Sequence, residues 1–153
     1  MRTALPPAAH LKPEGLTRMR LYQLDVQTRG ADELNEITDG VQARVAASGI
    51  ADGLCYIFSP HTTAGVTINE NADPDVKRDM IHALNRAVPR DDPAYRHAEG
   101  NSAAHVKASM MGFSAVVPVV AGRLTLGTWQ GIYLCEFDGP RRRHVLVTIV
   151  PVS

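Results

Sequence analysis

Apolar and polar residues alternate along several stretches of the 153-residue chain, and such alternation predicts strands with one buried face. Between residues 20 and 28, Tyr22, Leu24 and Val26 alternate with polar residues. Short apolar or β-branched runs predict further strands over 54–58, 62–68, 115–120, 123–128, 131–137 and 144–150. The short connections between the last strands predict that the C-terminal third forms consecutive antiparallel neighbours.

Apolar residues spaced three and four apart predict an amphipathic helix after the first strand. Asp32 is the expected N-cap, and Gly49 stands where the helix would end. The buried stripe is expected to hold Leu34, Ile37, Val41 and Val45.

Two more helices are predicted from their terminal residues. Asp73-Pro74 is a helix start, because aspartate caps free amides and proline at the first position loses no hydrogen bond. This helix should close at Pro89, before a polar loop that runs to residue 101. Ser102 can cap a short helix over 103–111 that stops at Gly112. Strands and helices together define an α+β fold of one domain, residues 18–153, preceded by a flexible N-terminal arm, residues 1–17, that contains three prolines.

Charge and composition narrow the function classes. The 16 basic and 16 acidic residues balance, so nothing favours binding to nucleic acid or to a membrane surface. No apolar stretch has the length of a membrane span, and the N-terminus lacks the apolar core of a signal peptide. Cys55 and Cys135 lie in apolar runs and are expected to be reduced core thiols, which fits a cytoplasmic protein.

Titratable and amide residues gather at three places. The first contains His61 at a strand end, and then Asn69, Glu70 and Asp73 at a helix N-terminus, where free amides can hold an anion. The same residues also fit a loop with a capping aspartate and a surface histidine. Both interpretations stay open.

The second place holds His97, Glu99 and His105. Neutral imidazole suits zinc and similar metals. The spacing of eight residues matches no compact zinc motif, however, and loop histidines are commonly exposed to solvent.

The third place holds Trp129 and Gln130 between two glycines, and it fits either a ligand close to the backbone or a bulge with a packing tryptophan. Arg141, Arg142 and Arg143 fit a solvated turn or a site for phosphate or carboxylate. The chain contains no Walker loop, dinucleotide glycine fingerprint, nucleophile elbow or CxxC motif.

Four stretches in this order resemble the YjbQ family, also called UPF0047, over residues 20–151. They are HTTA (61–64), TINENADP (67–74), GNSAAHVKASMMG (100–112) and GRLTLGTWQGI (122–132). The resemblance implies an α+β fold with a mixed, largely antiparallel β-sheet and helices packed on one side. It also implies a homotrimer with a polar site near the subunit boundaries.

Carried over by position, the resemblance implies which residues surround that site. The residues are His61, Asn69, Glu70, Asp73, His97, His105 and Gln130. Members are sometimes labelled secondary thiamine-phosphate synthases, which join a pyrimidine diphosphate to a thiazole phosphate with loss of pyrophosphate. That chemistry normally uses a divalent metal, zinc or magnesium here, and cationic groups, for which the candidates are Lys107, Arg123, Arg142 and Arg143.

Three hypotheses follow. The first is an enzyme for a small phosphorylated or anionic substrate, with metal on His61, His97 and His105, and with Glu70 as acid or base. The second is a trimer that binds a small anion or a metal without turnover. The third is a structural protein whose polar loops only seal the trimer.

Overall fold

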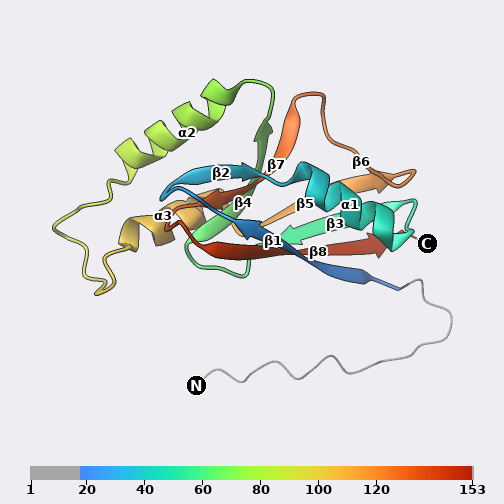
Figure 1. Ribbon diagram of the computed structural model, residues 1–153, viewed down its shortest axis with the longest axis horizontal. Helices are drawn as coiled ribbons and strands as arrows, with labels where there is room; N and C mark the ends of the chain where they lie inside the picture. The colour runs from blue at the N-terminus through green and yellow to red at the C-terminus, as the bar shows by residue number, and fades with distance from the viewer. Residues whose placement is uncertain (1–17, 153) are drawn as a thin grey trace, which may run out of the picture.

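The computed structural model describes residues 18–152, so the arm predicted for residues 1–17 lies outside the described residues. The elements follow one another as shown in Figure 1: β1 (Arg20–Gln27), β2 (Glu33–Glu36), α1 (Thr38–Ser48), β3 (Gly53–Phe58), β4 (Ala64–Glu70), α2 (Pro74–Ala87), α3 (Ser102–Met111), β5 (Ser114–Val120), β6 (Arg123–Leu124), β7 (Gln130–Glu136) and β8 (Arg142–Pro151). Within this part of the chain, no helix is long and apolar enough to cross a membrane.

The strands form two sheets in which every pairing is antiparallel. The five-stranded sheet has the order β1-β8-β3-β5-β6, and the three-stranded sheet has the order β2-β7-β4. The predicted run of consecutive antiparallel neighbours at the C-terminus is therefore wrong beyond the β5–β6 hairpin. The short turn after β7 carries the chain from one sheet to the other, and β6 contains two residues instead of the predicted six.

The predicted start of the first helix is also wrong. Leu34 lies in β2 and pairs with Cys135 of β7, and α1 begins only at Thr38. A spacing of three between Leu34 and Ile37 fits a helix, but hydrogen bonds to a strand distant in sequence override that local pattern. Asp32 accepts hydrogen bonds from two side chains instead of capping a helix.

The other helix ends agree with the sequence except at the start of α3. The Asp73 carboxylate accepts the amide of Asp75 at 2.9 Å, and Pro74 is the first residue of α2. Gly49 ends α1 with φ of 70°, in the left-handed region that glycine adopts without strain. α3 ends before Gly112, as expected, and its N-cap is Asn101, one residue before Ser102.

Two apolar cores separate three layers. The larger core lies between the five-stranded sheet on one side and α1 with the three-stranded sheet on the other, and its residues include Val41, Cys55, Leu134 and Val147. The smaller core packs α2 and α3 on the opposite face of the three-stranded sheet, where Leu84 and Ala108 meet Tyr133 and Phe137 (Figure 1). Both cysteines are buried and unbridged, and burial raises the pKa of each thiol to about 12.

A buried ion pair joins the two sheets. Arg143 of β8 donates from Nε and Nη2 to the two oxygens of Glu136 of β7, at 2.8 and 2.6 Å. Arg143 also donates to the Thr63 hydroxyl at 2.8 Å, and Thr28 donates to Glu136 at 2.9 Å. The backbone amides of Phe137 and Asp138 complete the shell around the carboxylate.

Burial alone would raise the pKa of Glu136, but Arg143, the amide of Asp138 and the Thr28 hydroxyl lower it below its ordinary value. A lowered pKa means that folding favours the ionised form. The resulting stabilisation is complete above the ordinary pKa of a glutamate and is lost as the pH falls through the lowered value.

We predict that Arg143→Met lowers the free energy of unfolding by about 3–5 kcal/mol, because it leaves the Glu136 carboxylate buried and unpaired. Arg142→Met is the matched control, since that neighbouring side chain is exposed, and it should change the free energy by less than about 0.5 kcal/mol. Urea unfolding of both variants measures the difference. Equal midpoints would contradict the prediction.

Candidate functional site

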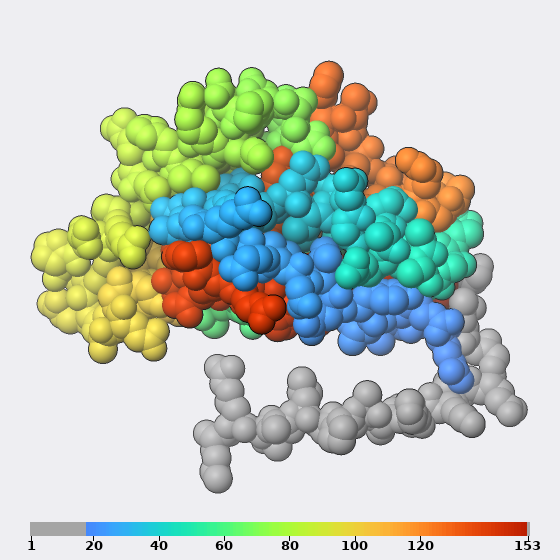
Figure 2. Space-filling model, in the orientation of Figure 1, coloured from blue at the N-terminus to red at the C-terminus, as the bar shows by residue number. Residues whose placement is uncertain are grey.

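Three loops meet in a cleft of about 300 Å³ at one end of the three-stranded sheet. The loop before β4, the start of α3 and the turn between β7 and β8 supply its lining residues: Pro60, His61, Thr62, Thr63, Glu99, Asn101, His105, Asp138, Arg141 and Arg143. Sheet pairing brings the first and third loops together, because Ala64 at the start of β4 pairs with Glu136 at the end of β7. In Figure 2 the loop before α3, coloured yellow-green to yellow, forms one end of the molecule. We call this hollow the His61–His105 cleft.

His61 is held by the backbone of β8. Its Nε2 atom lies 3.1 Å from the amide nitrogen and 3.0 Å from the carbonyl oxygen of His144. In either tautomer Nε2 is therefore engaged, and Nδ1 is the nitrogen left for a ligand. Burial lowers the pKa of His61, and the positive charges of Arg143 and His144 lower it further, so the ring is neutral at pH 7.

His105 lies in the same cleft, and its ring meets the ring of His97 edge to face with centroids 5.3 Å apart. His61 makes a similar contact with His144, with centroids 5.0 Å apart. These four histidines are thus arranged as two pairs. Across residues 18–152, no group of three or more histidine, cysteine, aspartate or glutamate side chains is placed to hold a metal ion.

Two polar residues of the cleft, Asn101 and Asp138, were not candidates from the sequence, whereas Arg141 was one of the three arginines that fit a site for phosphate or carboxylate. Asp138 accepts hydrogen bonds from Asn101 and Arg141, each at 2.9 Å, and the other amide atom of Asn101, Oδ1, is buried with no hydrogen-bond partner within residues 18–152. Asn101 lies in the predicted polar loop, and Asp138 lies in the predicted turn after the strand 131–137. The only signal in the sequence for Asp138 is that this turn places an acidic side chain close to Arg141, next to a buried strand.

The candidates Asn69, Glu70, Asp73 and Gln130 lie at the opposite end of the three-stranded sheet. Glu70 pairs with Gln130 at the far end of β4 and β7. From Ala64 to Glu70 the strand spans about 20 Å at roughly 3.3 Å per residue. Within one chain, these residues and the His61–His105 cleft therefore form two separate groups.

Local hydrogen bonds occupy part of that second group. Asn69 Oδ1 accepts the amide of Glu70 at 2.7 Å, and Gln130 Oε1 accepts the amide of Gly127 at 2.8 Å. Asp73 caps α2. Trp129 is 64% exposed, so it is not the packing tryptophan that one interpretation of the sequence expected.

The candidate cations have different surroundings. Lys107 is buried and donates to Asp32 and Asn85 at 2.9 and 2.6 Å, and Arg143 is bound to Glu136. Arg123 begins β6 at the other edge of the five-stranded sheet.

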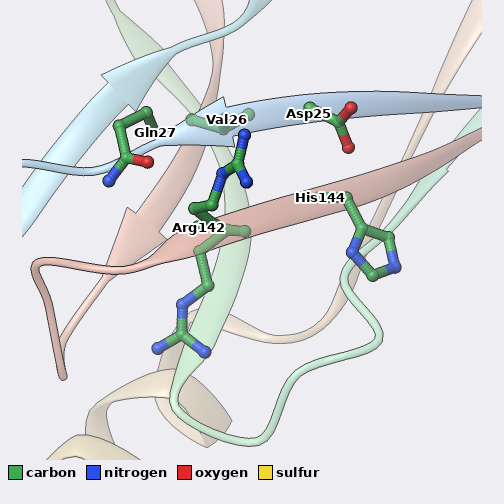
Figure 3. Close-up of a pocket in the computed structure, with 6 residues that line it drawn as sticks. Asp25, Val26, Gln27, Arg142 and His144 are labelled. Atoms are coloured by element: carbon green, nitrogen blue, oxygen red, sulfur yellow. The ribbon is translucent and has the colours of Figure 1, made fainter.

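Arg142 points away from the core into a second hollow, of about 500 Å³, beside Asp25, Gln27 and His144 (Figure 3). No hydrogen bond or ion pair within residues 18–152 engages its guanidinium, whereas Arg141 and Arg143 are both paired. We call this hollow the Asp25–Arg142 hollow.

The fold and the cleft define a class: a two-sheet antiparallel α+β domain with a histidine-lined cleft between its loops. The family model described as UPF0047 protein YjbQ-like matches residues 22–152, and the chain belongs to this family. The family and the α+β fold expected from the sequence are thereby confirmed.

Relatives and solved structures agree. The chain is 54% identical to the UPF0047 protein YugU of Bacillus subtilis over 130 residues, which are 85% of this chain and 98% of the relative. A crystal structure of an uncharacterized conserved protein of the family from Clostridium acetobutylicum is 50% identical with a TM-score of 0.82, covering 84% of this chain and 99% of that one. A protein of unknown function from Sulfolobus solfataricus is 36% identical, also with a TM-score of 0.82, covering 88% and 100%.

We predict that His61 takes up its proton at a lower pH than a histidine in an unfolded chain, because burial and the nearby Arg143 disfavour the imidazolium. An NMR titration of the ring C–H resonances measures this, with the peptide of residues 58–64 as reference. A midpoint at or above that of the peptide would contradict the prediction.

Proposed function

We propose that this protein is an enzyme that acts on a small phosphorylated or otherwise anionic substrate in the His61–His105 cleft. The observation that carries the proposal is a neutral imidazole, His61, with Nδ1 left for a ligand, in the same cleft as His105 and the exposed guanidinium of Arg141. A neutral histidine can accept a proton at pH 7, and a guanidinium binds phosphate through charge-assisted hydrogen bonds.

Within this proposal the residues have separate roles. His61 and His105 transfer protons, and Arg141 contacts the anion while Asn101 and Asp138 hold that arginine at the cleft. Lys107 and Arg143 are already paired with Asp32 and Glu136, so we assign them no direct contact with the anion. The named reaction is thiamine-phosphate synthesis as a side activity, in which the thiazole nitrogen forms a bond to the pyrimidine methylene carbon while the bond from that carbon to pyrophosphate breaks. The departing pyrophosphate would be the anion that Arg141 stabilises and the group that receives a proton from His105.

A divalent metal, zinc or magnesium, on His61, His97 and His105 is part of the same proposal. Imidazole nitrogens suit zinc, and the rings of His97 and His105 are already in contact. Since the described side chains form pairs instead of a trio, metal binding requires the rings to reorient, and no proton transfer proposed above depends on it.

Self-association as a homotrimer is the third part of the proposal. Asn69, Glu70, Asp73 and Gln130 lie too far along β4 and β7 to reach His61 of their own chain. They can act on the same substrate only if a second copy brings them to the cleft. Glu70 would then supply the acid or base, and Asn69 and Gln130 would orient the substrate.

Two alternatives use the same geometry without catalysis. A small-anion or metal-binding trimer would retain a small molecule through purification and leave it unchanged. A purely structural role would make alanine at His61 or His105 weaken the oligomer and leave ligand binding intact.

We predict that His105→Ala lowers the rate of thiamine phosphate formation at least about 100-fold, because it removes a proton-transfer group from the cleft. The assay uses purified protein, the pyrimidine diphosphate and the thiazole phosphate. His82→Ala is the control, since that histidine is exposed on α2 away from the cleft. Wild-type activity in His105→Ala would remove His105 from the catalytic residues.

We predict that Arg141→Ala weakens binding of inorganic pyrophosphate about tenfold to hundredfold, the value of a charge-assisted hydrogen bond. Isothermal titration calorimetry measures the dissociation constant. Arg123→Ala is the control, because Arg123 lies three strands away from β8 in the five-stranded sheet. Unchanged binding in Arg141→Ala would contradict its assignment as the anion contact.

A further inference from the structure

The Asp25–Arg142 hollow has no part in the reaction proposed above, although it holds an arginine that is free to bind a ligand. Its volume is about 500 Å³, which lies within the range of pockets for small molecules. Among residues 18–152, no hydrogen bond or ion pair engages the guanidinium of Arg142, whereas both neighbouring arginines are paired. A free guanidinium presents several N–H donors to a phosphate or a carboxylate.

Hydrogen bonds hold the backbone that carries Arg141 and Arg142. The Arg141 amide donates to the Thr28 hydroxyl at 2.8 Å, and the Arg141 carbonyl accepts from the Thr28 amide at 3.0 Å and from Gln27 Nε2 at 3.2 Å. Arg142 lies opposite Gln27 in the register of β1 and β8. Arg141 lines the His61–His105 cleft, and Arg142 lines the hollow (Figure 3). Two consecutive residues therefore supply one guanidinium to each site.

A single layer of side chains separates the hollow from the cleft. The pairing of β3 with β8 ends at Phe58 opposite Leu146, so the next part of the β8 edge faces His61 instead of a strand. His61 lines the cleft, His144 lines the hollow, and the centroids of their rings are 5.0 Å apart. Groups bound on the two sides of this layer can therefore belong to two reactants that meet beside it.

The proposed reaction needs two anion sites, because both of its substrates carry phosphate. The thiazole nitrogen bonds to the pyrimidine methylene carbon while the bond from that carbon to pyrophosphate breaks. In such a displacement the nucleophile approaches the carbon from the side opposite to the leaving group. Arg141 is assigned to the departing pyrophosphate, so the phosphate on the thiazole requires a different cation.

We infer that the Asp25–Arg142 hollow binds the anionic group of the second substrate, which in the named reaction is the phosphate of the thiazole. The inference rests on the proposed function and adds the class of the second substrate, a small monophosphate. Arg142 donates to the phosphate oxygens, and the imidazole of His144 is a second donor in the same hollow (Figure 3).

Asp25 limits the charge that the hollow accepts. Its carboxylate is exposed, accepts a hydrogen bond from Gln23 Nε2 at 2.7 Å, and lies opposite His144 in the strand register. Arg143 also lines the hollow, but its charge is balanced by Glu136. With one free guanidinium and one carboxylate, the hollow has nothing to balance the extra charge of a pyrophosphate, so it favours a single phosphate.

The first test does not depend on the reaction. The full-length protein is titrated with inorganic phosphate at constant pH and ionic strength, and the histidine rings are followed by NMR. The ring of His144 reports on the hollow and that of His105 on the cleft, assigned with His144→Gln and His105→Gln. We expect a saturable shift at His144, with a dissociation constant that rises at least about tenfold in Arg142→Ala, the value of a charge-assisted hydrogen bond.

Two further variants separate a specific site from a general effect of charge. Arg20→Ala is the matched control, because it removes the same charge from an exposed arginine at the other end of β1, and it should bind phosphate like wild type. Asp25→Asn removes the repelling charge and should tighten the binding seen at His144 about twofold to fivefold. Weaker binding in Asp25→Asn would overturn the inference.

The second test is steady-state kinetics with both substrates of the named reaction. Arg142→Ala should raise KM for the thiazole phosphate at least about tenfold and change KM for the pyrimidine diphosphate less than about twofold. Arg20→Ala should leave both values unchanged. If Arg142→Ala raises only KM for the pyrimidine diphosphate, the hollow does not bind the second substrate.

The outcomes separate this inference from the function on which it rests. If phosphate shifts His105 and not His144, or if Arg20→Ala and Arg142→Ala weaken the His144 response equally, the inference is overturned and the proposed function stands. If no thiamine phosphate forms, the named reaction is overturned, and a His144 response that Arg142→Ala abolishes still supports a phosphate site in the hollow. A response at neither ring overturns both.

Discussion

The ion pair between Arg143 and Glu136 is the constraint on which the arrangement of the two sheets depends. Each residue belongs to a different sheet and both are buried, so while the sheets are packed each charge is stabilised by the other and by hydrogen bonds instead of by water. Taking both charges out of water is costly, and the structure offsets that cost by giving the carboxylate five hydrogen bonds. Such a pair tolerates one relative position of β7 and β8 because bidentate geometry is narrow.

The Arg143–Glu136 pair also fixes the geometry of the His61–His105 cleft. Arg143 also binds Thr63, which follows His61 by two residues, and the strand that carries Arg143 presents the His144 backbone to His61. The same guanidinium helps to keep His61 neutral. Along β8 the side chain of Arg143 is buried in the ion pair with Glu136, whereas the side chain of the preceding residue, Arg142, is exposed in the Asp25–Arg142 hollow.

Structural features that depend on residues close together in the sequence could be predicted. Features that depend on pairing between strands far apart in the sequence could not. Alternation located β1, and the Asp73 cap and Gly49 located helix ends, because each involves neighbours within a few residues. Leu34 was misassigned because its partner, Cys135, lies about a hundred positions away. In the site, the chemistry of imidazole made the histidines candidates, and His61 and His105 do lie in one cleft. Asn101 and Asp138 could not be predicted as site residues, because they meet only when the fold brings the two loops together.

The separation of the two polar groups is the remaining constraint on function. β4 and β7 are a paired, largely buried stretch of sheet, and the polar groups sit at its two ends, so no loop motion short of unfolding the sheet brings Glu70 to His61. Either the two groups serve different purposes or separate copies supply them to one site. In the latter case two copies have to meet before one site contains both groups. Activity would then depend on protein concentration as well as on the histidines themselves.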